Sequence, residues 1–171
     1  MEDFEKVLPK LVKIQLFNDF NPDNQEDRRI LKLVYASMKI KNFKKKDVII
    51  KEGDSGDSFY ILYKGTVFIS RATPSGDQIA LATLSADQNI FFGETALISD
   101  DTRSATVTAT TDCTLISLSG TEFEELCKKE PVLGYKVLLV LANRMAKTIR
   151  DTNRDKATLY QALFNEIAEN N

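Results

Sequence analysis

The sequence contains no histidine among its 171 residues, and this absence removes several classes of function together. It excludes acid or base catalysis by histidine and the catalytic serine or cysteine sites that need an imidazole. It also excludes zinc sites with imidazole ligands. The two cysteines, Cys113 and Cys127, are too few for a four-thiolate metal centre, so we expect both to be small core residues. The prediction is a protein that is not an enzyme and that uses no metal and no cofactor.

Long apolar runs and a strong excess of one charge are also missing. No run approaches the roughly 20 residues that span a bilayer, and the N-terminal region carries Glu2, Asp3, Glu5 and Pro9 where a signal peptide has its apolar core. The net charge of −2 argues against a general nucleic-acid binder. The short basic run 44–46 is typical of a solvated face, and we assign it no role. We therefore expect a cytoplasmic protein that binds neither DNA nor membranes.

The hydrophobic pattern changes its period along the chain. Apolar residues recur every three or four positions up to residue 40, with a break at Asn21-Pro22-Asp23-Asn24, which predicts N-terminal helices over 1–42. From Phe43 the pattern becomes strand-like, and short runs follow at 48–50, 58–63, 66–71, 79–84, 104–109 and 114–118. A tight hairpin at Lys64-Gly65 and a longer hairpin loop at 74–77 predict an antiparallel meander that forms a sandwich or a barrel over 43–118.

The C-terminal third returns to helical spacing. Ser119 followed three residues later by Glu122 predicts a capping box and a helix start. Pro131 interrupts this helix, and a long second helix runs from about Val132, so we expect helices over 119–171. Its apolar seam fits equally well a helix packed on its own barrel and a helix that dimerises. The composition, 43% hydrophobic and 28% charged, fits a single domain over 1–171.

One segment interrupts the strand pattern in a way that suggests binding chemistry. It reads Phe92-Gly93-Glu94-Thr95-Ala96-Leu97-Ile98, and after a short spacer Arg103-Ser104-Ala105-Thr106-Val107. Gly93 permits close backbone approach, while unpaired N–H groups at a helix start and the guanidinium of Arg103 would bind a phosphate. Glu94 beside such a site needs another partner, such as a sugar hydroxyl, so a sugar phosphate satisfies both residues. The alternative is a structural Arg103–Glu94 ion pair, which contributes about 0–1 kcal/mol.

This segment resembles the phosphate-binding cassette of the cyclic nucleotide-binding domain family. The family pattern is Phe-Gly-Glu, an apolar residue, a small residue and Leu, followed after a spacer by Arg, a small residue, Ala and Thr. The similarity extends through Phe43 to Asp54 and through Asp57 to Gly65, and covers about residues 15–155. The resemblance implies an α+β fold, with an antiparallel β jelly-roll barrel, N-terminal helices, a long C-terminal helix and a cassette over 92–107. Thr95 departs from the family pattern, which has an apolar residue there.

The resemblance also implies roles for individual residues. Glu94 would bind the ribose 2′-hydroxyl, and Arg103 would pair with the exocyclic oxygens of the cyclic phosphate. Phe92 and Gly93 open the cassette. The backbone N–H groups of Thr95, Ala96 and Ala105, with the hydroxyl of Ser104, would complete the phosphate cradle; Thr152 and Asn153 on the last helix are candidates for the base contact, by similarity to the catabolite activator branch.

The same resemblance bears on the ligand. Some cGMP-selective members carry threonine after the cassette arginine, and Ser104 stands at that position. The catabolite activator branch carries serine there and prefers cAMP. We therefore expect a sensor for a cyclic purine nucleotide, with cAMP favoured over cGMP.

The effector is the remaining question. After the strands only helices remain, without room for a helix-turn-helix module, so we expect the C-terminal helix to transmit binding to an unknown protein effector or a homodimer mate. The alternative is a degenerate jelly-roll scaffold that binds no nucleotide and serves in interaction or dimerisation. Intact Glu94 and Arg103 favour the sensor.

Overall fold

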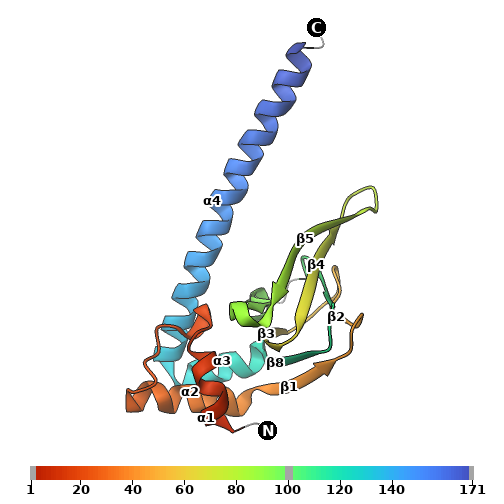
Figure 1. The fold of residues 1–171 in the computed structure, drawn as a ribbon. Helices are drawn as coiled ribbons and strands as arrows, with labels where there is room; N and C mark the ends of the chain where they lie inside the picture. Colours follow the sequence, from red (N-terminus) through yellow and green to blue (C-terminus); the bar gives the residue numbers. More distant parts are fainter. Residues whose placement is uncertain (1–2, 99–101, 170–171) are drawn as a thin grey trace.

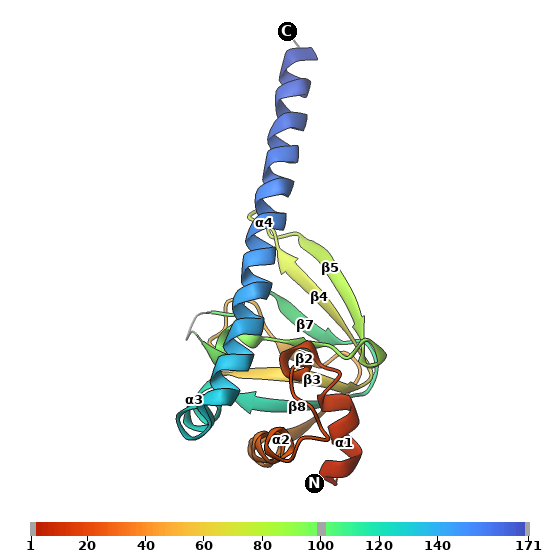
Figure 2. The same ribbon diagram turned by 90° about the vertical axis from the view of Figure 1, so that its left-hand side faces the viewer.

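The computed structural model describes residues 3–98 and 102–169, which form antiparallel sheets flanked by helices (Figures 1 and 2). The N-terminal helices are α1 (Phe4–Leu11), the 3-10 helix η1 (Gln15–Phe17) and α2 (Gln25–Ser37). The chain ends with α3 (Gly120–Lys129) and α4 (Pro131–Glu169). Figure 1 shows α4 passing beside the sheets and then projecting away from the other elements toward the C-terminus.

In the described residues, eight strands lie between the two helical regions. They are β1 (Lys39–Phe43), β2 (Val48–Ile50), β3 (Ser58–Lys64), β4 (Thr66–Ala72), β5 (Gln78–Ser85), β6 (Phe91–Phe92), β7 (Thr106–Ala109) and β8 (Cys113–Ser119). One sheet has the order β1-β8-β3-β6 and the other β2-β7-β4-β5, and every pairing is antiparallel. Two further 3-10 helices, η2 (Ala86–Gln88) and η3 (Glu94–Leu97), flank β6. The predicted α+β class, with antiparallel sheets and helices, is confirmed.

The predicted meander is wrong at Lys64-Gly65. Lys64 ends β3 opposite Thr114 of β8, whereas Thr66 begins β4 opposite Ser85 of β5, so the chain changes sheet at this point. Gly65 has a φ of 96°, and a Cβ there would lie 2.6 Å from the carbonyl oxygen of Asp112. Glycine is therefore required at the point where the chain crosses between the sheets. The prediction failed because such a crossing has the same local composition as a tight hairpin. The hairpin loop predicted at 74–77 is confirmed, because β4 and β5 pair across it.

The first strand begins earlier than the sequence pattern indicates. Met38 fits the helical spacing of α2, but α2 ends at Ser37 and Met38 is extended, with φ −80° and ψ 150°. Lys39 already pairs with Ser117 of β8. Residues 39–42 are therefore strand and not helix, because pairing with a distant strand overrides the local periodicity.

Strand β3 connects the two hydrophobic clusters of the structure. Phe59 and Ile61 face the cluster formed with the helices, while Tyr60 and Leu62 face the cluster between the sheets. Both faces of β3 are buried, so its sequence is continuously apolar instead of alternating. Because β3 also pairs with β6, this doubly buried strand fixes the segment from which the cassette begins.

Two lysines join the N-terminal helices to the rest of the structure. Lys10 of α1 donates hydrogen bonds to the carbonyl oxygens of Tyr63 at 2.9 Å and Ala86 at 2.7 Å, and its burial lowers its pKa. Lys136 of α4 donates to the carboxylate of Asp27 in α2 at 3.0 Å. Among the described residues, no helix is both long and apolar enough to cross a membrane.

The two cysteines, which the sequence predicts to be small core residues, are free thiols. Cys113 is buried, and Cys127 is half-buried against Gly134, where burial raises the pKa of its thiol to about 11. Both therefore act as small packing residues.

The predicted capping box at the start of α3 is confirmed. The Ser119 hydroxyl accepts a hydrogen bond from the Glu122 N–H at 3.2 Å, and Glu122 Oε2 accepts one from the Ser119 N–H at 3.2 Å. Lys39 of β1 also donates to Glu122 at 2.7 Å. These donors, Lys39 first, lower the pKa of Glu122 to about 2. The ionised carboxylate therefore fastens the helix start to an edge strand.

This lowered pKa predicts an acid-dependent loss of stability. Because the carboxylate is stabilised in the folded state, its contribution is fully present above about pH 4.5 and is lost as the pH falls toward 2. Glu122→Gln and Lys39→Met should each make the free energy of unfolding fall less steeply over this range than in the wild type. Urea unfolding followed by circular dichroism at several pH values measures this slope. Lys45→Met, at an exposed lysine, is the matched control, and slopes parallel to the wild type in all variants would contradict the prediction.

Candidate functional site

The candidate site begins where β6 ends. Phe92 is buried between the sheets and stacks on Tyr60, with ring centroids 5.8 Å apart. Gly93 then takes a left-handed conformation with φ 73°, and η3 follows at once. A Cβ on Gly93 would lie 2.9 Å from Nη1 of Arg103 and 3.2 Å from the carbonyl oxygen of Ser58. Glycine at this position therefore satisfies both the backbone conformation and the close approach of Arg103.

Arg103 is a buried cation at the centre of the site, with only 8% of its surface exposed. Its guanidinium donates hydrogen bonds to the carbonyl oxygens of Ser58 at 2.6 Å and Gly93 at 3.2 Å. Its own backbone pairs with the preceding loop, through Arg103 N–H to the Asp54 oxygen at 2.9 Å and Gly53 N–H to the Arg103 oxygen at 2.9 Å. Both the side chain and the backbone of Arg103 are thus held in place.

No carboxylate among the described residues forms an ion pair with Arg103. Backbone carbonyls satisfy two of its five N–H donors but carry no full charge. A buried charge is normally paired, because desolvating it costs several kcal/mol. Within the described part of the chain, Arg103 therefore has a positive charge without an anionic partner, which is the chemistry that binds an anion.

Glu94 forms its ion pair with a residue of the last helix. Nε of Arg144 lies 3.0 Å from Oε1 of Glu94, and the Arg144 guanidinium lies over the Phe91 ring, 4.6 Å from its centroid. The structural Arg103–Glu94 pair that the sequence left open is therefore replaced by two separate interactions. Arg103 is bound by backbone, and Glu94 is bound by α4.

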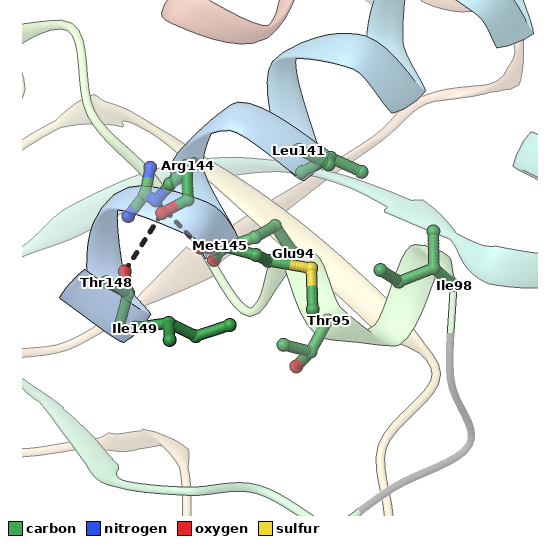
Figure 3. A pocket seen from close by; sticks show the side chains of 8 residues that line it. All are labelled: Glu94, Thr95, Ile98, Leu141, Arg144, Met145, Thr148 and Ile149. Atoms are coloured by element: carbon green, nitrogen blue, oxygen red, sulfur yellow. Dashed lines mark hydrogen bonds and ion pairs between the residues drawn. The ribbon is translucent and has the colours of Figure 1, made fainter. Parts of the chain in front are cut away.

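A cavity of about 270 Å³ lies between η3 and α4 (Figure 3). Figure 3 shows Glu94 and Thr95 on the cassette side and the side chains of α4 opposite them. The full lining is Glu94, Thr95, Ile98, Leu141, Arg144, Met145, Thr148 and Ile149. Four of these eight side chains are apolar, two are threonines, and the other two are one carboxylate and one guanidinium. Such a lining suits a ligand that has a flat apolar part and a polar part.

The other predicted residues have varied positions. Thr95 and Ser104 are exposed, Ala105 is half-buried, and Ala96 is buried with its N–H donating to the Gly93 oxygen at 3.2 Å. Thr152 and Asn153 are exposed on α4, and neither lines the cavity. The structure thus brings Arg103 to Gly93 at the start of the cassette, while the ligand contacts of the other cassette residues and of Thr152 and Asn153 stay predictions.

Sequence reasoning missed the α4 wall of the cavity. The residues are Leu141, Arg144, Met145, Thr148 and Ile149. Their helical spacing was visible, since they recur at three- and four-residue intervals. The face that meets the cassette was not, because it depends on where α4 crosses the sheets.

A family model named cyclic nucleotide-binding domain matches residues 40–130. The chain belongs to this family. The cAMP-dependent protein kinase regulatory subunit of Dictyostelium discoideum is 37% identical to it over 87 residues, which cover 50% of this chain and 27% of that protein. The match therefore covers only about a quarter of the length of that relative.

Solved structures of the same fold are also similar to this cyclic nucleotide-binding domain. The N-terminal domain of a transcriptional regulator from Streptomyces coelicolor A3(2) matches with a TM-score of 0.71 and 26% identity, over 84% of this chain and 94% of that one. The regulatory domain of Toxoplasma gondii PKA, in a co-crystal structure with cAMP, matches with a TM-score of 0.63 and 26% identity, over 74% and 46% of the two chains.

The packing of Arg103 predicts an unusual sensitivity at Gly56. A Cβ at this position would lie 2.6 Å from Nη2 and 2.8 Å from Cζ of Arg103, although Gly56 itself has no left-handed φ. Gly56→Ala should therefore destabilise the cyclic nucleotide-binding domain by about 1–3 kcal/mol, through displacement of the guanidinium. In an Arg103→Ala background the space is vacant and the same substitution should cost much less. Urea unfolding of the four proteins measures this coupling, and additive costs would contradict it.

Proposed function

We propose that this cyclic nucleotide-binding domain is a cytoplasmic sensor that binds a cyclic purine nucleotide, cAMP in preference to cGMP. The observation that carries the proposal is the buried guanidinium of Arg103, held by the backbone of Ser58 and Gly93 and without a carboxylate partner among the described residues. An anionic phosphate supplies the missing charge. Glu94, the first residue of η3 in the same cassette, supplies acceptors for a sugar hydroxyl, so one cyclic nucleotide uses both groups.

The remaining contacts of the phosphate follow from its proposed position beside Arg103. The exocyclic phosphate oxygens lie against Arg103, the hydroxyl of Ser104 and the N–H groups of Thr95 and Ala105. The Ala96 N–H donates to the Gly93 oxygen at 3.2 Å in this structure. In the proposed complex it turns toward the phosphate and donates to it instead. The two sheets close around the ligand as a jelly roll.

The proposed position of the base follows from the lining of the cavity. The purine lies toward α4, where Leu141, Met145 and Ile149 form the apolar part of the cavity wall. Thr152 and Asn153 are exposed, and reach it when α4 bends toward the sheets. Relatives at 37% identity include proteins named as cAMP-dependent and as cGMP-dependent, so the proposed preference for cAMP rests on the serine at Ser104 and on the similar structure crystallised with cAMP.

The proposed output is a change in the seating of α4. This helix forms one wall of the cavity, and from Met145 onward its large apolar side chains are exposed. A ligand that bridges the cassette and α4 shifts the population of two helix positions, because it contacts both. The apolar residues of the distal helix then transmit this change to a protein effector or to a dimer mate.

Calorimetric titration with cAMP and with cGMP tests the binding proposal. The wild type should bind cAMP at micromolar concentration or tighter, and Arg103→Ala should weaken binding at least tenfold, since a hydrogen bond to a charged group contributes about 1.5–3 kcal/mol. Arg103→Lys keeps the charge without the planar donor and serves if the alanine variant does not fold. Arg71→Ala, at an exposed arginine of β4, is the matched control. Folded, nucleotide-free protein that binds neither ligand would contradict the proposal and favour a scaffold.

Hydrogen exchange tests the proposed transmission. Amides of α4 in the segment 138–150 should exchange several-fold more slowly when cAMP is bound, because the ligand closes the cavity that this segment lines. The amides of α2, which lies away from the cavity lining, are the internal control. Equal exchange of α4 with and without bound cAMP would contradict transmission through this helix.

A further inference from the structure

The first two strands meet at a corner of the structure that is rich in lysine. β1 pairs only with β8 among the described residues, so it is an edge strand, and β2 is an edge strand of the other sheet. Figure 1 shows β1 leading away from α4 to the turn before β2. We call the lysine corner the surface formed by β1, by the turn 44–47 and by Lys64, which ends β3.

Most lysines of this corner have no carboxylate partner. Lys44 pairs with Asp112 at 2.9 Å, and Lys39, at the start of β1, pairs with Glu122 at 2.7 Å. Four others form no ion pair among the described residues, and these are Lys41, Lys45, Lys46 and Lys64. The lysine corner is therefore a positive surface on a chain whose net charge is −2.

The backbone of the turn is fixed although its lysine side chains are exposed. The Asp47 N–H donates to the Lys44 oxygen at 3.0 Å, and the Lys46 N–H donates to the Ala109 oxygen at 2.7 Å. The Lys44 N–H in turn donates to the Asp47 carboxylate at 2.7 Å. Lys46 has a φ of 82° at the third position of this turn, where glycine is favoured. A lysine held in a conformation that suits glycine points to a use for its charge.

The shape of the corner favours an extended acidic peptide as the binding partner. The free edge of β1 offers backbone N–H and C=O groups, which pair with an added strand. Lys39 and Lys41 lie two positions apart on one face of β1, so carboxylates at alternate positions of an added strand would stand opposite them. A cavity of about 220 Å³ at the end of β1, lined in part by Phe43, Lys44 and Lys64, has room for one side chain of such a peptide.

We propose that the lysine corner is a docking surface for an acidic, extended segment of a partner protein, which adds to β1 as a further strand. Lysine on an edge strand opposes pairing with uncharged strands, and the same charges here admit a strand that carries carboxylates. The corner shares no lining residue with the cavity between η3 and α4. The proposed docking therefore goes beyond nucleotide binding and does not require it.

Fluorescence anisotropy of a labelled synthetic peptide tests the proposal. In this peptide glutamate alternates with threonine, and one threonine is replaced by phenylalanine. The wild-type chain should bind it saturably at low ionic strength and more weakly as salt is added, because salt screens attraction between exposed charges. A wild-type chain that does not bind the peptide would overturn the proposal.

Two triple variants with the same net charge separate the corner from the charge of the whole chain. The corner variant, Lys45→Glu with Lys46→Glu and Lys64→Glu, should weaken binding about tenfold or more. The control variant reverses three exposed lysines of α2 and α4 and should bind nearly as the wild type does; it combines Lys32→Glu, Lys147→Glu and Lys156→Glu. Equal weakening in both variants would overturn the proposal. If the corner variant does not fold, the corresponding substitutions by glutamine replace it in both sets.

Hydrogen exchange separates strand addition from simple charge attraction. The amides of β1 that do not bond to β8 should exchange several-fold more slowly when the peptide is bound. A peptide with methylated backbone nitrogens keeps its charges but lacks the donors, and should bind about tenfold more weakly. Unchanged exchange in β1, or equal binding of the methylated peptide, would overturn the addition of a strand.

Other anionic partners are tested in the same assay with vesicles that contain phosphatidylserine and with a DNA duplex. Tighter binding of either probe than of the peptide, lost in the corner variant, would assign the corner to a membrane or to nucleic acid and overturn the proposal. Weaker binding of both probes supports it. All of these outcomes are independent of the calorimetric titration with cAMP.

Discussion

The burial of one guanidinium is the constraint around which the site is built. Arg103 stays inside the structure because carbonyl oxygens from two separate segments, those of Ser58 and Gly93, accept its hydrogen bonds. This arrangement requires β3 and β6 to be paired, a left-handed residue at Gly93, and a residue without a side chain at Gly56. The guanidinium of Arg103 therefore determines the shape of both the cassette and the loop before β3.

The core makes this arrangement rigid, since β3 and β6 each contribute to both hydrophobic clusters. Phe91 faces the helices and Phe92 faces the space between the sheets, as Phe59 and Tyr60 do on β3. Close-packed interiors do not deform smoothly, so a displacement of the cassette also displaces side chains in both hydrophobic clusters. Leu97 of η3 also belongs to the hydrophobic cluster formed with the helices. The cassette therefore packs in the same cluster as the buried residues of α4.

Local signals in the sequence were sufficient for the parts of the fold and site that depend on neighbouring residues. The capping box at Ser119, the hairpin loop at 74–77, and the adjacent glycine and glutamate of the cassette all belong to this class. The change of sheet at Gly65 does not, because it depends on pairing with strands about 20 and 50 residues away. Arg144 was missed for the same reason, since it meets Glu94 from 50 positions further along the chain.

The separation of the two arginines would allow one small site to hold an acid and the proposed anionic ligand together. If Glu94 paired with Arg103, the buried positive charge would be cancelled, and a phosphate would face a neutral pair. Two unit charges about 4 Å apart interact by about 4 kcal/mol at an effective dielectric constant of 20, so this cancellation would be large. Because Arg144 takes the carboxylate instead, Arg103 keeps its charge for an anion and Glu94 remains available to a hydroxyl. The distribution of charge therefore depends on α4, which lies outside the cassette.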